Sequence, residues 1–423
     1  MERLGSFEHS SNLLKNKVLI PTHKGKISMI NNWSLFWKWE RFFIYCWITM
    51  GKKNYFFTSE CVTQGHPDKV CDQISDAILD ECFKQDPYSR VAVECLITDG
   101  KLIIAWEVTT KAQFSYEVVA RKVLSDIGYS TQESWFDVKN SEIEVLVHTQ
   151  SPDISQWVEI WGAGDQWIMF WYASNEAEDY LPLTLDLSRK LALKLTEVRK
   201  NGTLPYLFPD WKTQVTAEMN ENWGLERIDT IIISAHHSED VSIEKITEDL
   251  KNYVITPVLW WKIDDSVKIY INPTWKFVIW WPAGDTWLTW RKIIVDTYWG
   301  AWRHGWWAFS WKDPTKVDRS AAYIARFLAK NIVANWYCDK CEIQLSYAIW
   351  VVQPISIFLE DFGTAKVEKS KIIDYINEHY DLSPSWIIKF LDLRRPIYRK
   401  TAEIGHFWFD DYPREKIDNW NID

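Results

Sequence analysis

Residues 305–320 read GWWAFSWKDPTKVDRS, a stretch that joins a loop rich in lysine to the start of a helix. Lys312 and Lys316 alternate with aspartates, the last of which, Asp318, opens an apolar-periodic run. Lysines and a helix N-terminus attract phosphate oxygens, and a carboxylate can hold a divalent cation. The stretch predicts a polyphosphate and metal site ahead of a helix over residues 318–331. A solvated, charged helix start without a ligand is the alternative.

Written with glycine at its three tryptophans, the same stretch becomes GGGAFSGKDPTKVDRS. In that form it resembles a signature of the S-adenosylmethionine synthetase (methionine adenosyltransferase) family. Two more stretches resemble signatures of this family: QGHPDK at residues 64–69 and GAGDQWIMFWYA at residues 162–173. Three long motifs in the family's order are far more specific than a lone glycine-rich loop. The resemblance covers residues 53–417.

Composition limits the function classes. A chain of 423 residues can bury a large core and hold two or three domains. The net charge of −10 argues against a nucleic-acid surface, which needs a basic stripe. It does not argue against ATP, which needs only a local cluster of cations. Seven scattered cysteines indicate reduced thiols, so we expect a cytoplasmic protein.

The first 49 residues differ in character from the rest. They mix basic and apolar residues without a clear period, and the resemblance begins only after Met50. They hold neither an apolar run near the ~18 residues of a membrane span nor a signal-peptide layout. We expect residues 1–49 to be translated upstream sequence and Met50 to be the native start; an amphipathic membrane anchor is the alternative. The resemblance implies an N-terminal domain at 50–153, a central domain at 161–277 and a C-terminal domain at 279–416.

Local patterns predict a mixture of helices and strands. Helices are predicted from Pro67 onward and over residues 116–127, 182–199, 242–253, 289–298, 318–331 and 369–380. Strands are predicted over residues 55–58, 91–97, 101–109, 142–147, 213–218, 230–234, 276–279, 342–349 and 356–362. Because helices and hairpins mix without strict βα alternation, the predicted class is α+β. The resemblance implies three similar α+β domains around a pseudo-threefold axis. The polar stretch at residues 150–164 is expected to be a boundary and a mobile lid.

The resemblance also implies a reaction. The methionine sulfur attacks C5′ of ATP and expels the triphosphate, which the same site hydrolyses to pyrophosphate and phosphate. A thioether is a neutral nucleophile and needs no general base, so the enzyme has to align it and stabilise a highly charged leaving group. We therefore expect a site rich in lysine, arginine and metal ligands.

The resemblance places roles on individual residues of this sequence. The catalytic positions are His66, Lys212, Arg291, Lys292 and Lys312. These five also bind ATP, together with Asp210, Lys276, Phe277, Asp285 and Ala308. The methionine-binding positions are Glu107, Gln150, Asp285 and Lys316. Asp68 and Asp318 are the ligands expected for a pair of Mg²⁺ ions, and Glu94 is the ligand expected for K⁺. Without the resemblance, His66 would be interpreted as a helix cap, Phe277 as a core residue and the Arg291–Lys292 pair as solvated charge.

The expected partners are ATP and L-methionine, without nucleic acid or membrane. A homodimer or homotetramer is implied, with active sites at the dimer interface. One alternative function is a relative that keeps the tripolyphosphatase step without alkyl transfer, and such a protein would lack Glu107, Gln150 or Asp285. All three are present. The other is a non-enzymatic aromatic-rich binding protein, which predicts tryptophans at exposed strand spacing.

The tryptophan and glycine counts are abnormal: 29 tryptophans stand beside 15 glycines in 423 residues, where glycine alone is usually ~7%. Glycine serves where φ must be positive or backbone must approach closely, and an indole would fill that space. We expect that the gene uses UGA for glycine and was translated as if UGA meant tryptophan. The structure should then show strained or displaced glycine loops. Tryptophan stands where the family has glycine at Trp161, Trp167, Trp171, Trp275, Trp280, Trp281, Trp287, Trp290, Trp299, Trp306, Trp307, Trp311, Trp350 and Trp408.

Overall fold

The computed structural model separates the chain into two units, Met1–Asn54 and Tyr55–Asp423. In the first unit, β1 (Ile20–Pro21) pairs antiparallel with β2 (Ile27–Ser28). All other described elements belong to the second unit, and none of its described helices is long and apolar enough to cross a membrane. The structure describes residues 20–21, 27–28, 54–129, 137–149, 163–221, 223–260, 262–274, 276–278 and 286–422. Most of residues 1–49 and of the expected lid lie outside these ranges.

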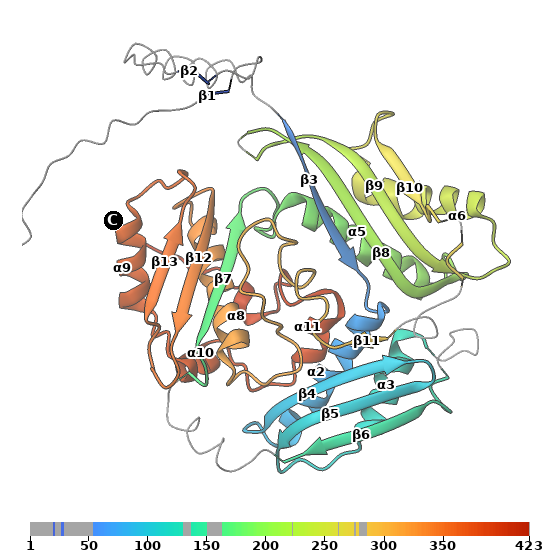
Figure 1. Ribbon diagram of the computed structural model, residues 1–423, viewed down its shortest axis with the longest axis horizontal. Coiled ribbons are helices and arrows are strands. Elements are labelled where there is room, and N and C mark those ends of the chain that lie inside the picture. The colour runs from blue at the N-terminus through green and yellow to red at the C-terminus, as the bar shows by residue number, and fades with distance from the viewer. Residues whose placement is uncertain are drawn as a thin grey trace, which may run out of the picture. The chain divides into compact units, whose positions relative to one another are not determined.

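Three sheets form the framework of the second unit (Figure 1). The first has the order β10 (Lys268–Ile271), β9 (Leu225–His237), β8 (Leu207–Met219) and β3 (Tyr55–Val62). The second has the order β11 (Trp287–Leu288), β4 (Arg90–Thr98), β5 (Lys101–Thr109) and β6 (Glu142–His148). The third has the order β13 (Ser356–Glu360), β12 (Lys340–Tyr347) and β7 (Trp167–Ser174).

Each sheet contains a strand from a neighbouring part of the chain. β3, from the expected N-terminal segment, pairs with β8 from Tyr55↔Met219 to Val62↔Lys212. β7 pairs with β12, and β11 pairs with β4. The sheets therefore do not follow the contiguous boundaries implied by the resemblance, and those boundaries stay a prediction.

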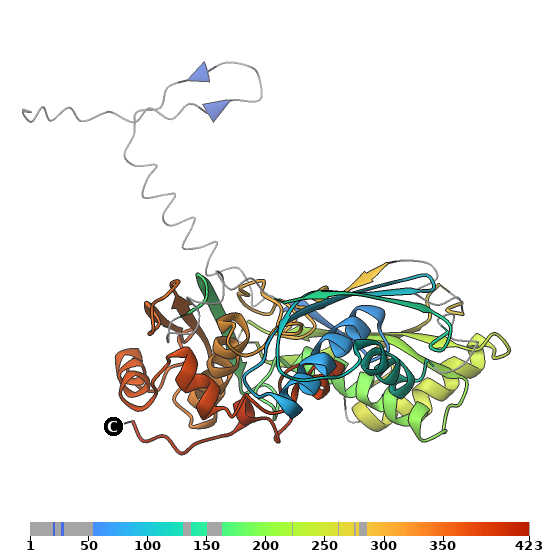
Figure 2. The ribbon, with the colours of Figure 1, turned by 90° about the horizontal axis from the view of Figure 1, so that it is seen from below.

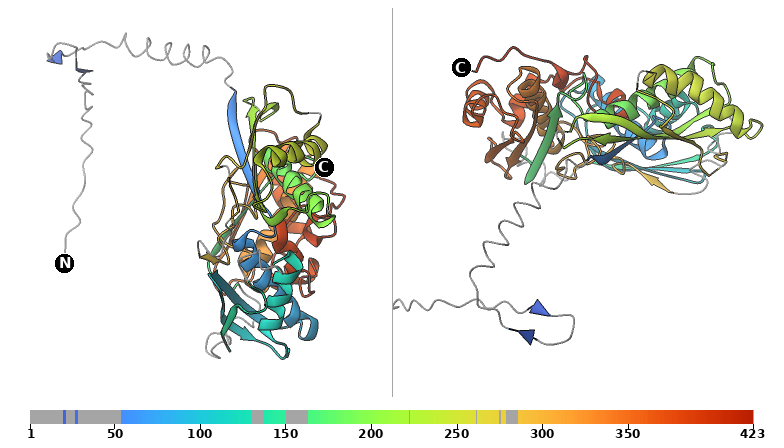
Figure 3. Two further views of the ribbon diagram at one scale, coloured as in Figure 1. Left: turned by 90° about the vertical axis from the view of Figure 1, so that its right-hand side faces the viewer. Right: turned by 90° about the horizontal axis from the view of Figure 1, so that it is seen from above.

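Helices cover the sheets. In Figure 2, α2 (Pro67–Gln85) and α3 (Tyr116–Ile127) lie together beneath the β4–β6 sheet, and α2 contacts β4. α5 (Leu183–Lys200) packs on β8 and β3, on the same side as α6 (Ile243–Leu250) in Figure 3. α8 (Val317–Ala334) packs on β7 and β12. The remaining helices are η2 (Lys251–Ile255), α7 (Thr256–Leu259), α9 (Lys369–His379), α10 (Pro384–Phe390), α11 (Tyr398–Ile404) and η3 (Pro413–Glu415).

Most predicted elements are present, and the α+β class is confirmed. Two predictions are wrong. Residues 276–278 are not a strand, because the Phe277 backbone binds the His237 ring and backbone instead of a neighbouring strand. Residues 289–298 form successive turns in place of a helix. Trp290 there has φ +68°, and its N–H donates to the Asp72 carboxylate at 2.9 Å, so the helical hydrogen-bond pattern does not propagate.

Candidate active site

A pocket of about 1090 Å³ opens where β4, the turns after β11 and the loop before α8 meet. Its lining brings together eight of the predicted site residues: Glu94, Lys212, Arg291, Lys292, Ala308, Lys312, Lys316 and Asp318. With Arg90 it presents six cationic side chains, against four carboxylates. A concave surface with an excess of cations suits a polyanionic ligand.

His66 caps α2 at one side of this region. Its Nδ1 accepts the Asp68 N–H at 3.2 Å, so the neutral ring carries its proton on Nε2. Burial, with Lys292 and Lys212 nearby, holds the pKa of His66 well below its usual value. The preceding Gly65 lies so close to Pro209 that a Cβ would come within 2.2 Å of the proline carbonyl oxygen. The ring is therefore a fixed, neutral N–H donor.

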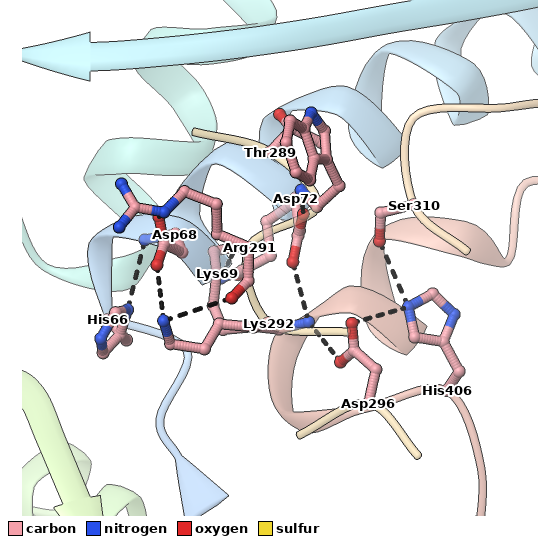
Figure 4. A network of polar contacts seen from close by, with 12 residues as sticks. His66, Asp68, Lys69, Asp72, Thr289, Arg291, Lys292, Asp296, Ser310 and His406 are labelled. Atoms are coloured by element: carbon pink, nitrogen blue, oxygen red, sulfur yellow. Dashed lines mark hydrogen bonds and ion pairs between the residues drawn. The ribbon is translucent and has the colours of Figure 1, made fainter. Parts of the chain in front are cut away.

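Asp68 ties α2 to the turn that carries two predicted catalytic cations (Figure 4). One carboxylate oxygen accepts Lys292 Nζ at 2.6 Å, and the other accepts the Leu288 N–H at 3.1 Å. Arg291 Nε lies 3.8 Å from Asp68. The first turn of α2 thus fixes the positions of both cations.

The loop before α8 continues the edge of β4. Val93 donates its N–H to the Trp311 carbonyl at 2.9 Å, and Asp313 donates to the Val91 carbonyl at 3.0 Å. Lys316 Nζ binds Asp313 at 2.5 Å. Burial raises the pKa of Asp313, but Lys316 and Arg90 outweigh it, so this pKa falls to about 2. The pinned loop holds Lys312 and Lys316 over the pocket.

Lys312 and Asp318 contact one another inside the pocket wall, and both are buried. Burial, with Arg319 and Lys316 nearby, lowers the pKa of Lys312 to about 7, while the charge of Glu94 acts in the opposite direction. Asp318 Oδ1 is buried and has no hydrogen-bond partner among the residues that the structure describes. A buried carboxylate oxygen without a donor fits the role of a cation ligand.

The remaining predicted metal residues have other partners. Glu94 Oε2 accepts the Trp290 indole N–H at 3.1 Å, and burial raises the pKa of Glu94. Among the described residues, no three His, Cys, Asp or Glu side chains form a group that could hold a metal ion. A metal bound by Asp68 and Asp318 would need further oxygens, which phosphates supply.

Several predicted site residues do not line the pocket. Lys276 is exposed and pairs with Glu239 at 3.3 Å, while Phe277 packs against the core. Asp210 is buried in β8. Glu107 lies 3.6 Å from His148 Nε2. Gln150 and Asp285 lie outside the described residues, as do Trp161, Trp275, Trp280 and Trp281.

Four buried aspartates on α2 form a row that the sequence analysis did not predict, although their regular spacing is visible in the sequence. Asp68, Asp72, Asp76 and Asp80 recur every four residues, which places them along one helical face. Asp72 accepts Lys69 Nζ at 3.1 Å and the Trp290 N–H. Asp76 accepts the Trp311 N–H at 3.2 Å, and Asp80 accepts the N–H groups of Tyr398 and Arg399, both at 2.9 Å. Asp68, Asp72 and Asp76 thus connect α2 to the segments that frame the pocket, and Asp80 connects it to the start of α11.

Three family models match the chain in order. The model described as S-adenosylmethionine synthetase, N-terminal domain, matches residues 54–152. The central-domain model of the same description matches residues 160–277, and the C-terminal-domain model matches residues 279–416. Together they cover nearly the whole of the second structural unit.

Proposed function

The chain belongs to the S-adenosylmethionine synthetase family and makes S-adenosylmethionine from ATP and L-methionine, and we propose that the reaction takes place in the pocket between β4 and the loop before α8. The observation that carries this proposal is the gathering of predicted cations from three parts of the chain around one cavity. Lys212 comes from β8, Arg291 and Lys292 from the turns after β11, and Lys312 from the loop before α8.

In the proposed reaction these cations bind the triphosphate of ATP. The charge on its oxygens grows as the bond to C5′ breaks, and fixed cations in a buried pocket stabilise that charge without reorganising. Methionine needs only to be held in line with C5′, because its sulfur is already a nucleophile. We assign Lys316, Glu107, Gln150 and Asp285 to the methionine side; Lys316 is the one supported by its place in the lining.

His66 is proposed to hold a proton at Nε2 toward the oxygen that leaves C5′. Its neutral state and its fixed tautomer support this role, because a neutral ring can donate without adding a charge that must be desolvated. The remaining ATP assignments, Asp210, Lys276, Phe277 and Ala308, stay predictions. Of these four, only Ala308 lines the pocket.

The family is known to need metal ions, and we propose Mg²⁺ at Asp68 and Asp318 and K⁺ at Glu94. When bound, a divalent metal neutralises phosphate charge. The unpartnered oxygen of Asp318 supports one ligand position. Asp68 would have to exchange its contact with Lys292, a change that would also release this lysine toward the triphosphate.

We further propose a cytoplasmic homodimer or homotetramer with active sites at the dimer interface. The edge strand β6 exposes apolar side chains that support an interface: Val145 and Leu146 are 40% and 52% exposed. The six cysteines among the described residues are free, which agrees with a reducing compartment.

The product balance tests this function. Purified protein should convert ATP and methionine into equal amounts of S-adenosylmethionine, pyrophosphate and phosphate, and only with a divalent metal, as chromatography of the nucleotides and a phosphate assay would measure. Chelation of the metal should abolish all three products. ADP or AMP in place of the triphosphate-derived products would overturn the assignment. Hydrolysis of supplied inorganic triphosphate to pyrophosphate and phosphate, without any S-adenosylmethionine formed from ATP and methionine, would favour the tripolyphosphatase alternative.

A further inference from the structure

Tryptophan occupies left-handed backbone positions in this protein. Among the described residues, nine of the thirteen non-glycine residues with positive φ are tryptophans. Left-handed backbone is strained for a residue with a Cβ, because the Cβ crowds the following carbonyl oxygen, and glycine avoids that strain. The nine are Trp106, Trp223, Trp290, Trp299, Trp306, Trp311, Trp336, Trp350 and Trp408, with φ from +49° to +112°.

The ends of α3 and α8 have the same backbone structure, with glycine at the left-handed position in one and tryptophan in the other. α3 ends at Gly128, with φ +114°; Gly128 donates its N–H to the Ser125 carbonyl and Tyr129 donates to the Leu124 carbonyl. The end of α8 has the same pattern. Trp336, with φ +65°, donates its N–H to the Val333 carbonyl, and Tyr337 donates its N–H to the Ile332 carbonyl. This arrangement normally has glycine at its left-handed position.

The tryptophan side chains bury little apolar surface, or pack poorly, at these positions. Trp306, Trp336 and Trp350 are 72%, 69% and 62% exposed, so they bury little apolar surface in return for the backbone cost. Trp408 is buried, but its ring centroid lies 3.0 Å from the guanidinium carbon of Arg189. Within the described part of the chain, no nitrogen of that guanidinium has a hydrogen-bond partner. Backbone and packing therefore both disfavour tryptophan.

We infer that these nine positions are glycine in the protein that the gene specifies, with UGA read as glycine in the source cell. The inference rests on backbone conformation and extends the expectation from sequence, because Trp106, Trp223 and Trp336 lie outside the positions where the resemblance implied glycine. Five of the nine line the pocket, so glycine there leaves a wider cavity. At position 290 it also frees Glu94 from the indole N–H.

Peptide masses of the protein isolated from its source cells test the inference without any activity measurement. Trypsin releases residues 304–312 as one peptide, which contains positions 306 and 311. We expect fragment masses with glycine at both. An indole at either position would overturn the inference.

A stability comparison tests the backbone argument in the chain as printed. Trp306→Gly and Trp336→Gly should each raise the midpoint of thermal unfolding by about 2 °C, since they relieve left-handed strain at exposed sites. Trp260→Gly is the matched control, because Trp260 is 71% exposed but has φ −44°. It should lower the midpoint, because glycine only adds freedom to the unfolded chain. A fall in the midpoint for all three variants would contradict the argument.

A second inference concerns His406, which is buried just after α11. Its Nδ1 lies 2.7 Å from the Tyr323 hydroxyl. On the other side of the ring, Nε2 lies 3.2 Å from Ser310 Oγ and 3.7 Å from Asp296 Oδ2 (Figure 4). Because Arg319 donates to the Tyr323 oxygen at 3.2 Å, that hydroxyl donates its proton to Nδ1. The neutral ring therefore donates from Nε2 toward Ser310 and Asp296.

These two contacts connect the segments that carry the predicted catalytic cations. Ser310 lies two residues before Lys312. Asp296 follows the Arg291–Lys292 turn, donates its N–H to the Lys292 carbonyl at 3.0 Å and accepts Lys69 Nζ at 2.6 Å. We propose that His406 is a positioning residue that holds the Lys312 loop and the Lys292 turn at a fixed separation. This proposal rests on the proposed function of the pocket.

Two conservative variants separate positioning from simple packing. The amide of His406→Gln reaches the Nε2 position and keeps a donor there, whereas His406→Asn reaches only the Nδ1 side. We expect kcat of His406→Asn to fall roughly tenfold or more below that of His406→Gln, with a smaller change in KM and similar unfolding midpoints. Equal kcat values, or a loss of kcat that follows a loss of stability, would overturn the proposal.

Hydrogen exchange gives a readout that does not depend on the assigned reaction. Amides of residues 304–312 should exchange faster in His406→Asn than in His406→Gln, because only the former loses the bond to Ser310. Equal protection of this loop in the two variants would overturn the positioning role. If the two variants differ in exchange but the wild-type protein makes no S-adenosylmethionine, only the proposed function is overturned.

Discussion

Lys312→Met should lower turnover by about 10²–10³-fold, because a fixed positive charge aimed at a departing triphosphate stabilises the transition state more than the ground state. Methionine keeps most of the length and volume of lysine, so the main loss is the charge. Lys312 is only 3% exposed, so its side chain also packs in the pocket wall. The measurement is the steady-state rate of S-adenosylmethionine formation by the Lys312→Met variant, compared with that of the wild-type protein.

Lys366→Met is the matched control. Lys366 is 43% exposed and pairs at 2.8 Å with Asp339, itself 45% exposed, so its loss should leave turnover unchanged. The unfolding midpoint of Lys312→Met should be compared with that of the wild type, because Asp318 loses a buried partner. Near-normal turnover in a folded Lys312→Met protein would remove this lysine from the mechanism.

Local signals were readable from the sequence, and non-local pairing was not. The periodic run after Asp318 predicted a helix, and α8 begins at Val317. The pairing of β3 with β8 joins residues about 150 positions apart, and no local pattern identifies such a partner. The turns at residues 289–298 were predicted as a helix because their apolar residues have helical spacing, yet Asp68 and Asp72 bind the N–H groups of Leu288 and Trp290.

The site was predictable to a similar degree. The resemblance that the three motifs carry predicted a shared site for cations from separate parts of the chain, and Lys212, Arg291, Lys292 and Lys312 do meet in the pocket. Lys276 and Phe277 are not part of its lining. The partners of the buried charges were missed, because four aspartates at helical spacing indicate a shared face without indicating what covers it.

Asp76→Ala should destabilise the protein by about 3–5 kcal/mol, because it leaves the Arg319 guanidinium buried without its counter-charge. Both groups are fully buried, and two parallel bonds of 2.9 and 2.7 Å join them. Arg319 also donates to the Lys312 carbonyl at 2.8 Å, so loss of the pair should loosen the Lys312 loop.

Urea unfolding followed by tryptophan fluorescence measures this effect, with Glu81→Ala on the same helix as the control. The Glu81–Lys84 pair is 31% and 52% exposed, so its loss should cost only about 0–1 kcal/mol. Because the main cost of Asp76→Ala is an uncompensated charge, adding Arg319→Met should recover part of the lost stability. Losses that simply add in the double variant would show that Asp76 stabilises the fold through its contact with the Trp311 N–H and not through Arg319.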